Sequence, residues 1–373
     1  MPLSTEGTST TPILTDNATE IIPKLEALQI ANPLEISTLE ASRTILEPSS
    51  HPPILALPPE ILSEIFIRFL PPYPDSPPFI GRYSPTCLIL VCREWYSVAI
   101  TTPALWRAMQ IGFPFHLLPS HEGGPALARL WLDRSGCLPL SIHASDMHVY
   151  NAFDFFQDVC RHCHRWEHLT MGISESDHLL EIAGLTMPLL RTLDITVDIE
   201  DVLYGPMIVH DAPLLRSVVL SDGEGRNVEL PWSQLTSLQL ECLIGDCMSI
   251  LQETPNLVSC TLRLIAPWTT EEPAHDPYTD ISLLHLETLV SKTEFSFVDI
   301  QFFRCLITPA LLCLEIPEGF LRSSDSDCVT LLKAFMAKSR CMLSELRVTN
   351  SRSTEGTYRA AFPDIHSIIV SAR

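Results

Sequence analysis

Four segments decide the fold: LLRTLDI (residues 189–195), LLRSVVL (214–220), QLTSLQL (234–240) and LLCLEI (311–316). Each follows the pattern apolar-x-x-apolar-x-apolar, which is typical of a short strand with one buried face. The pattern occurs eight times, in copies that begin at Trp166, Leu190, Leu215, Leu235, Leu257, Leu286, Leu311 and Leu343. Successive copies start 24, 25, 20, 22, 29, 25 and 32 residues apart, so a return segment fits between neighbouring strands.

Return helices are predicted between several of these strands. Their apolar faces are marked by Phe153, Phe156, Val159 and Cys160, by Ile250 with Leu251, by Phe303 with Leu306, and by Leu332 with Phe335. The whole segment resembles a divergent leucine-rich repeat domain, although the repeats lack the usual asparagine and vary in length. A doubly wound α/β domain is the alternative, because isolated strand patterns are ambiguous.

A different pattern occupies the chain before residue 110. The segment LALPPEILSEIFIRFL (55–70) predicts an amphipathic helix that Pro71 ends. Six prolines in residues 71–85 predict an extended loop. A second helix is expected to start at Ser84, as the cap, and Pro85, with a buried stripe of Leu88, Val91, Cys92, Trp95, Val98 and Ala99. One further turn, residues 104–106, is expected to pack Trp106 against the helical pair.

This segment resembles the F-box, through LPPEIL (57–62), SEIF (63–66), LVCREW (90–95) and PALW (103–106) in order. The resemblance implies binding to a Skp-family adaptor, and through it to cullin and RING subunits. The positions that match the family, and that it implies bind the adaptor, are Leu57, Pro58, Glu60, Ile61, Leu62, Ile65, Phe66, Val91, Cys92 and Trp95. The proline-rich loop is longer than the usual connection, and an ordinary helical hairpin packed on its own chain is the alternative.

The expected fold class is therefore α+β and multidomain: a small all-α F-box helical module followed by an irregular leucine-rich-repeat α/β solenoid. The expected domains are a mostly disordered segment over 1–50, the F-box domain over 51–110, and a substrate-binding repeat domain over 111–373. Residues 1–50 hold fourteen Ser or Thr and five Pro, a composition that buries little apolar surface.

The overall composition excludes several classes of binding partner. A net charge of −21, from 24 basic and 45 acidic residues, argues against nucleic-acid binding. The chain contains no run of eighteen apolar residues, and MPLSTEGTST does not resemble a signal peptide. We therefore expect a protein of the cytoplasm, the nucleus or both, without a membrane partner, in which most of the twelve cysteines are reduced.

One cluster of cysteines and histidines could in principle bind a haem or a metal ion. Cys160, His162, Cys163 and His164 match the CxxCH pattern of haem attachment and offer zinc ligands. No second ligand pair stands at a workable spacing, and Cys160 and Cys163 fall on one apolar helical face with Phe156 and Val159. We expect no metal, no cofactor and no catalytic residue, since no GxSxG or HExxH motif occurs either.

The predicted function is that of a substrate-recognition subunit of an SCF-type (Skp-cullin-F-box) ubiquitin ligase. The alternatives are a non-degradative interaction scaffold and, ranked last, a metal-dependent enzyme built on residues 160–164. Residues that alternate with the buried positions should form a substrate surface: Thr192 and Asp194, Ser217 and Val219, Ser237 and Gln239, Thr261 and Arg263, Thr288 and Val290, Cys313 and Glu315, and Glu345 and Arg347. Its predicted anchors are Asp194, Gln239, Arg263, Glu315 and Arg347.

Overall fold

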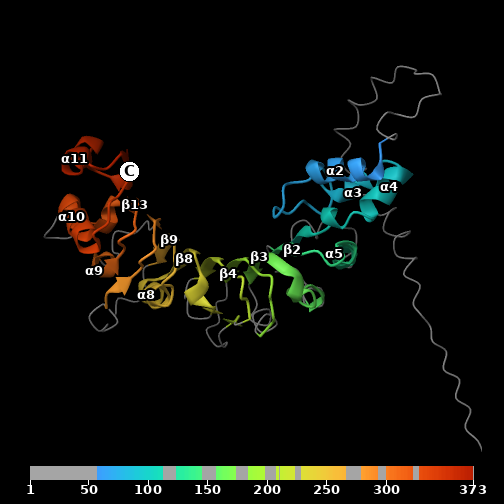
Figure 1. Ribbon diagram of the computed structural model, residues 1–373, viewed down its shortest axis with the longest axis horizontal. Coiled ribbons are helices and arrows are strands. Elements are labelled where there is room, and N and C mark those ends of the chain that lie inside the picture. The colour runs from blue at the N-terminus through green and yellow to red at the C-terminus, as the bar shows by residue number, and fades with distance from the viewer. Residues whose placement is uncertain are drawn as a thin grey trace, which may run out of the picture.

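One large parallel sheet forms the centre of the computed structural model, which describes residues 57–111, 123–144, 157–173, 184–197, 207–209, 211–222, 228–265, 279–292, 300–321 and 327–372. The sheet has eleven strands in the order β1-β2-β3-β4-β6-β8-β9-β11-β13-β14-β15. Strand order therefore follows chain order without the reversal that defines a doubly wound sheet. In Figure 1 the strands follow an arc, with α2 to α4 at one end and α10 and α11 at the other.

All eight strands that the sequence pattern predicts are present in this sheet. They are β3 (Trp166–Ile173), β4 (Thr192–Val197), β6 (Ser217–Asp222), β8 (Ser237–Leu243), β9 (Ser259–Ile265), β11 (Thr288–Ser291), β13 (Cys313–Pro317) and β14 (Glu345–Ser351). Three more strands escape the pattern: β1 (Ala108–Ile111), β2 (Leu140–Ala144) and β15 (Ser367–Ala372). In β2 even Ser141 is buried, so the strand does not alternate between apolar and polar residues as the pattern requires.

Helices and short turns connect the strands. The helices are α2 (Pro59–Phe69), α3 (Pro85–Leu88), α4 (Arg93–Ile100), α5 (Gly123–Arg134), α8 (Ile244–Gln252), α9 (Ile300–Cys305), α10 (Cys328–Ser339) and α11 (Glu355–Ala361). The 3-10 turns are η4 (Pro103–Leu105), η6 (Cys163–Arg165), η7 (Trp232–Gln234) and η8 (Glu318–Leu321). Two small parallel pairs join β5 (Met207–Ile208) to β7 (Val228–Glu229) and β10 (Ile281–Ser282) to β12 (Leu306–Ile307).

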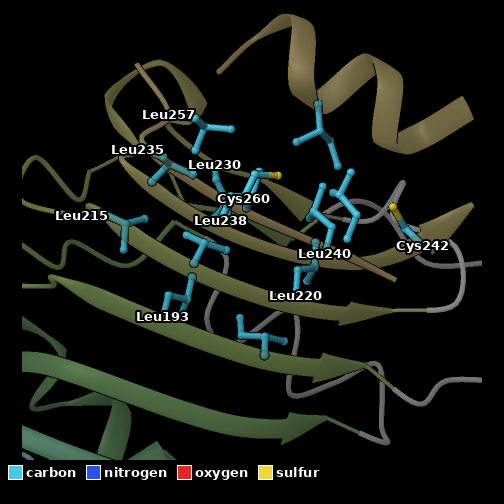
Figure 2. Packing of buried hydrophobic residues seen from close by; sticks show 14 of the residues in the cluster. Leu193, Leu215, Leu220, Leu230, Leu235, Leu238, Leu240, Cys242, Leu257 and Cys260 are labelled. Carbon is cyan, nitrogen blue, oxygen red and sulfur yellow. The ribbon is translucent and has the colours of Figure 1, made fainter. Parts of the chain in front are cut away.

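The core lies between one face of the sheet and these return segments. Leu193, Leu238 and Leu240 point from their strands into it, and Figure 2 shows them packed beside Leu230 and Leu235 of the returns. Helix α8 covers the same side, and its own Cys247, Ile250 and Leu251 are buried in this core. Burial of this apolar layer is the main term that stabilises the sheet.

The predicted fold class is wrong. The structure is an α/β arrangement on one large parallel sheet with helices, and not a small all-α module followed by a leucine-rich-repeat solenoid. Strand β1 contains residue 110, which is the predicted boundary between the two parts. The predicted disordered segment over 1–50 lies outside the residues that the structure describes.

Aromatic packing is the physical reason why the N-terminal helices do not form a separate unit. Trp106 follows η4, is fully buried, and donates its indole N–H to the carbonyl oxygen of Ala99 at 2.8 Å. Its ring meets Trp131 of α5 edge to face, at 5.4 Å between centroids, and Trp131 in turn contacts Phe79 of the proline-rich loop at 4.8 Å. Helices, loop and sheet thus share one hydrophobic core.

The predicted second helix is also divided. It begins as predicted, with Pro85 in the first turn and Ser84 as cap, but α3 ends at Leu88 and α4 starts only at Arg93. Cys92 is extended and occupies the N-cap position of α4 without a side-chain capping bond, and Val91 before it is exposed instead of joining a buried stripe. None of the helices in the described ranges is long and apolar enough to span a membrane.

Candidate functional site

Helix α2 presents two different faces. Leu62 and Phe66 point into the core and are 3% and 1% exposed. Ile61 and Ile65, one turn apart, are 49% and 41% exposed. The residues of α2 that were predicted to bind the adaptor therefore fall into two groups. Leu62 and Phe66 pack α2 against the rest of the protein, and Ile61 and Ile65 are exposed and accessible to a partner.

Helix α4 packs against α2 and extends this surface. The ring of Trp95 lies 4.8 Å from that of Phe66, and its indole nitrogen is buried without a hydrogen-bond partner. Val91, in the turn before α4, is 58% exposed. The remaining predicted positions divide in the same way: Pro58 and Glu60 are exposed, and Leu57, Cys92 and Trp95 are half-buried.

The proline-rich loop between α2 and α3 reaches the sheet through Tyr73. The Tyr73 hydroxyl donates to Glu167 at 2.8 Å, and Arg107 lies over its ring at 3.7 Å from the centroid. Its ring also meets His168 edge-on, at 5.5 Å. Beside it, Ser141 Oγ donates to the carbonyl oxygen of Pro74 at 2.6 Å. Burial and the bond to Glu167 raise the pKa of Tyr73, so the phenol remains a donor at neutral pH.

The outward-facing residues of the sheet form two continuous rows. The first row is Ser141, His168, Thr192, Ser217, Ser237, Ser259, Thr288, Cys313, Glu345 and Ser367. The second row is His143, Thr170, Asp194, Val219, Gln239, Thr261, Val290, Glu315, Arg347 and Ile369. We call these two rows, together with Glu241 and Arg263 one step beyond the second row, the sheet face. The predicted alignment of neighbouring strands is confirmed at every strand except β9.

On β9 the prediction is displaced by two residues. Cys260 takes the first buried position, so Ser259 and Thr261 occupy the two rows. Arg263 lies one step further along the strand, beside Glu241. Alternation alone does not fix this choice, because Cys260, Leu262 and Leu264 are all buried, and both Ser259 with Thr261 and Thr261 with Arg263 alternate with them. His143 and Ser141 were not predicted as members of the surface, since their strand was not predicted.

Most charges on the sheet face are paired. Arg263 lies 3.3 Å from Glu241, and Arg347 lies 2.6 Å from Glu345 and 3.7 Å from Glu315. The hydrogen bond from Arg347 holds the pKa of the Glu345 carboxyl below its ordinary value. Among the predicted anchors, Glu315 and Arg347 are thus brought together, whereas Asp194 and Gln239 stand on separate strands to either side of Val219.

The Cys160–His164 cluster lies in a packed corner. Cys160 and Arg165 are buried, and Arg165 donates to Ser135 Oγ at 2.6 Å and to the carbonyl oxygen of Leu138 at 3.0 Å. Burial lowers the pKa of His162. Within the described ranges, no group of three or more His, Cys, Asp and Glu side chains is placed to hold a metal ion. Phe153 and Phe156, which the predicted helical face includes, lie outside the described residues.

The chain matches no protein-family model and no curated protein sequence. The resemblance to the F-box therefore rests on the residues quoted above and on nothing else.

Proposed function

We propose that this protein is the substrate-recognition subunit of an SCF-type ubiquitin ligase. The observation that carries the proposal is the ordered series LPPEIL, SEIF, LVCREW and PALW, combined with the exposure of Ile61, Ile65 and Val91. A Skp-family adaptor binds this surface and connects it to cullin and RING subunits. A separate enzyme transfers ubiquitin, and this chain contributes proximity.

The outward face of α2 supports this interface. Leu62 and Phe66 pack into the protein's own core and anchor the helix, so Ile61 and Ile65 are not needed to hold it in place. Two isoleucines one helical turn apart form a continuous apolar strip, and Val91 extends it from the turn before α4. Apolar side chains grouped in this way on a surface mark binding sites more often than scattered ones do.

The sheet face is the proposed substrate surface. It lies on strands that share a core with α2 and α4, so the adaptor and the substrate are held by one body. Loop contacts through Tyr73 tie the helices to Glu167 and Arg107 next to the face. A fixed separation between the two surfaces suits a receptor that must present its substrate to a bound enzyme.

The test is a binding measurement with purified Skp-family adaptor and a double variant, Ile61→Ala with Ile65→Ala. Loss of two exposed anchors should weaken binding by roughly 30-fold or more, since interface isoleucines of this kind each contribute about 1 kcal/mol or more. The matched control is Leu284→Ala with Leu312→Ala, which are 56% and 46% exposed but lie far along the chain, in the connecting segments before β11 and β13.

Circular dichroism should show both double variants folded, because all four side chains are exposed. Equal adaptor affinity for the two double variants, or no adaptor binding by the parent protein, would refute the proposed function.

A further inference from the structure

Asp194 differs from every other carboxylate on the sheet face. It lies on β4 in the second row, between Thr170 of β3 and Val219 of β6. Neither neighbour carries a charge. Its carboxyl is half-buried and forms no ion pair with any residue that the structure describes, whereas Glu241, Glu315 and Glu345 each lie within 4 Å of an arginine. Burial raises the pKa of the Asp194 carboxyl, and His143, two strands away in the same row, offsets only part of this effect.

The surroundings limit where a partner can lie. On the side of β2 and β3, the proline-rich loop covers the first row, through Tyr73 on His168 and Pro74 on Ser141. On the other side the first row continues as Thr192, Ser217, Ser237, Ser259 and Thr288, five small hydroxyl side chains in register. A shallow floor with hydroxyl groups favours an extended backbone, which brings its own donors and acceptors.

Gln239 offers a second contact for a segment that is bound at Asp194. It is exposed in the same row as Asp194 and two strands away, which corresponds to about 10 Å at the usual strand spacing. An extended chain covers that span with about three residues. A segment that pairs with Asp194 therefore passes Gln239 about three residues later, where the amide can bond to its backbone.

We propose that the sheet face binds an extended polypeptide segment whose arginine or lysine side chain pairs with Asp194. Charge complementarity decides the sign of the partner's charge: Arg263 and Arg347 are already paired with carboxylates, whereas the Asp194 carboxylate has no ion pair among the described residues of the face. The net charge of −21 attracts the same class of partner from a distance. Arginine is favoured over lysine, since its planar guanidinium can bond to both carboxylate oxygens.

The inference deepens the proposed function by naming the substrate class, and it rests on that function for the role of the bound segment.

The experiment uses the full chain and four pools of random short peptides with arginine, lysine, alanine or glutamate fixed at the centre. The parent protein should bind the arginine pool roughly tenfold more tightly than the alanine pool, as expected for a charge-assisted hydrogen bond. Asp194→Asn, which preserves shape, should abolish this preference. The matched control is Asp211→Asn, which removes the same charge at an exposed position between β5 and β6, outside the strands.

Several results would overturn the inference: equal binding of the arginine and alanine pools, preference for the glutamate pool, no binding at the highest soluble concentration, or an intact preference in Asp194→Asn. Adaptor affinity, measured on the same preparations, reports separately on the proposed function. Loss of the arginine preference with normal adaptor binding would refute only the substrate class. Normal arginine preference without adaptor binding would refute only the ligase role.

Discussion

The hydroxyl of Ser84 organises the entry into α3. It accepts a hydrogen bond from the backbone N–H of Thr86 at 3.1 Å and lies 2.7 Å from the carbonyl oxygen of Phe79, to which it can donate. Ser84 is fully buried, so neither group can turn to water instead. One side chain thus fixes both the start of the helix and the end of the proline-rich loop.

We expect Ser84→Ala to lower the free energy of unfolding by about 1–2 kcal/mol, because a helix cap and a buried hydrogen bond are lost together. Urea denaturation measures the change. Ser97→Ala, on the exposed face of α4, is the control and should stay within about 0.5 kcal/mol of the parent protein. Equal stability of the two variants would contradict the assigned role of Ser84.

Local chemistry of this kind could be predicted from the sequence. Ser84 and Pro85 follow the capping preferences of helices, and their positions are confirmed. Val91 and Arg263 could not be placed correctly by the same reasoning. The position of Val91 depends on a break between α3 and α4, which packing decides rather than local preference. The position of Arg263 depends on how β9 pairs with β8, because the alternation of buried residues is the same at Ser259, Thr261 and Arg263.

At the scale of elements, β8, α8 and β9 enclose three cysteines. Cys242, Cys247 and Cys260 are completely buried between the two strands and the helix, and Figure 2 shows Cys242 and Cys260 among the leucines of the core. Burial raises the pKa of Cys260 to about 12, and the pKa of Cys247 is raised by its hydrogen bond to Cys242 and by burial. Cys247 and Cys260 therefore remain protonated at neutral pH, and all three buried cysteines have the character of core residues.

Alkylation with iodoacetamide should therefore distinguish them from the exposed Cys137. In the native protein we expect Cys137 to react on the order of a hundredfold faster than the three buried thiols, since only the accessible thiolate is nucleophilic. Peptide mass spectrometry gives the extent of labelling at each site, and urea-unfolded protein, in which all four should react alike, provides the control. Rapid native labelling of Cys260 would show that β9 is not packed as described.

Element positions were predicted unevenly. Eight strands were predicted because their leucines alternate with polar residues, and the helices α2, α8 and α10 because their apolar residues repeat at helical spacing. Strands β1 and β2 carry no such alternation, since Met109 and Ile142 stand beside the buried Ala108 and Ser141. A strand buried on both faces has no polar face for a periodicity to reveal.

At the scale of the whole molecule, the fold class could not be predicted because it depends on contacts between distant segments. Phe79, Trp106 and Trp131 come from a loop, a turn and a helix that the sequence assigned to two different domains. The spacing of apolar residues along the chain carries no information on whether these rings contact one another. Their packing turns the N-terminal helices and the parallel sheet into one α/β unit.

Trp106→Ala tests whether the N-terminal helices and the sheet unfold as one unit. Removing a fully buried indole should lower the free energy of unfolding by about 3–5 kcal/mol. Hydrogen exchange followed by mass spectrometry should show faster exchange in α2 and in β3 together, because they share the core that the variant weakens. Faster exchange in the helices with an unchanged rate in β2 and β3 would indicate two independent units.

The sequential strand order also bears on how the chain folds during synthesis. From β2 onward, each strand of the large sheet pairs with one that precedes it in the chain. Its partner has therefore already left the ribosome when the strand itself emerges, and no strand must wait for a distant C-terminal segment. The tryptophan-rich core around Trp106, Trp131 and Trp166 is complete early, so later strands add to an existing edge. Pairing between near neighbours keeps loop-closure entropy small at every step.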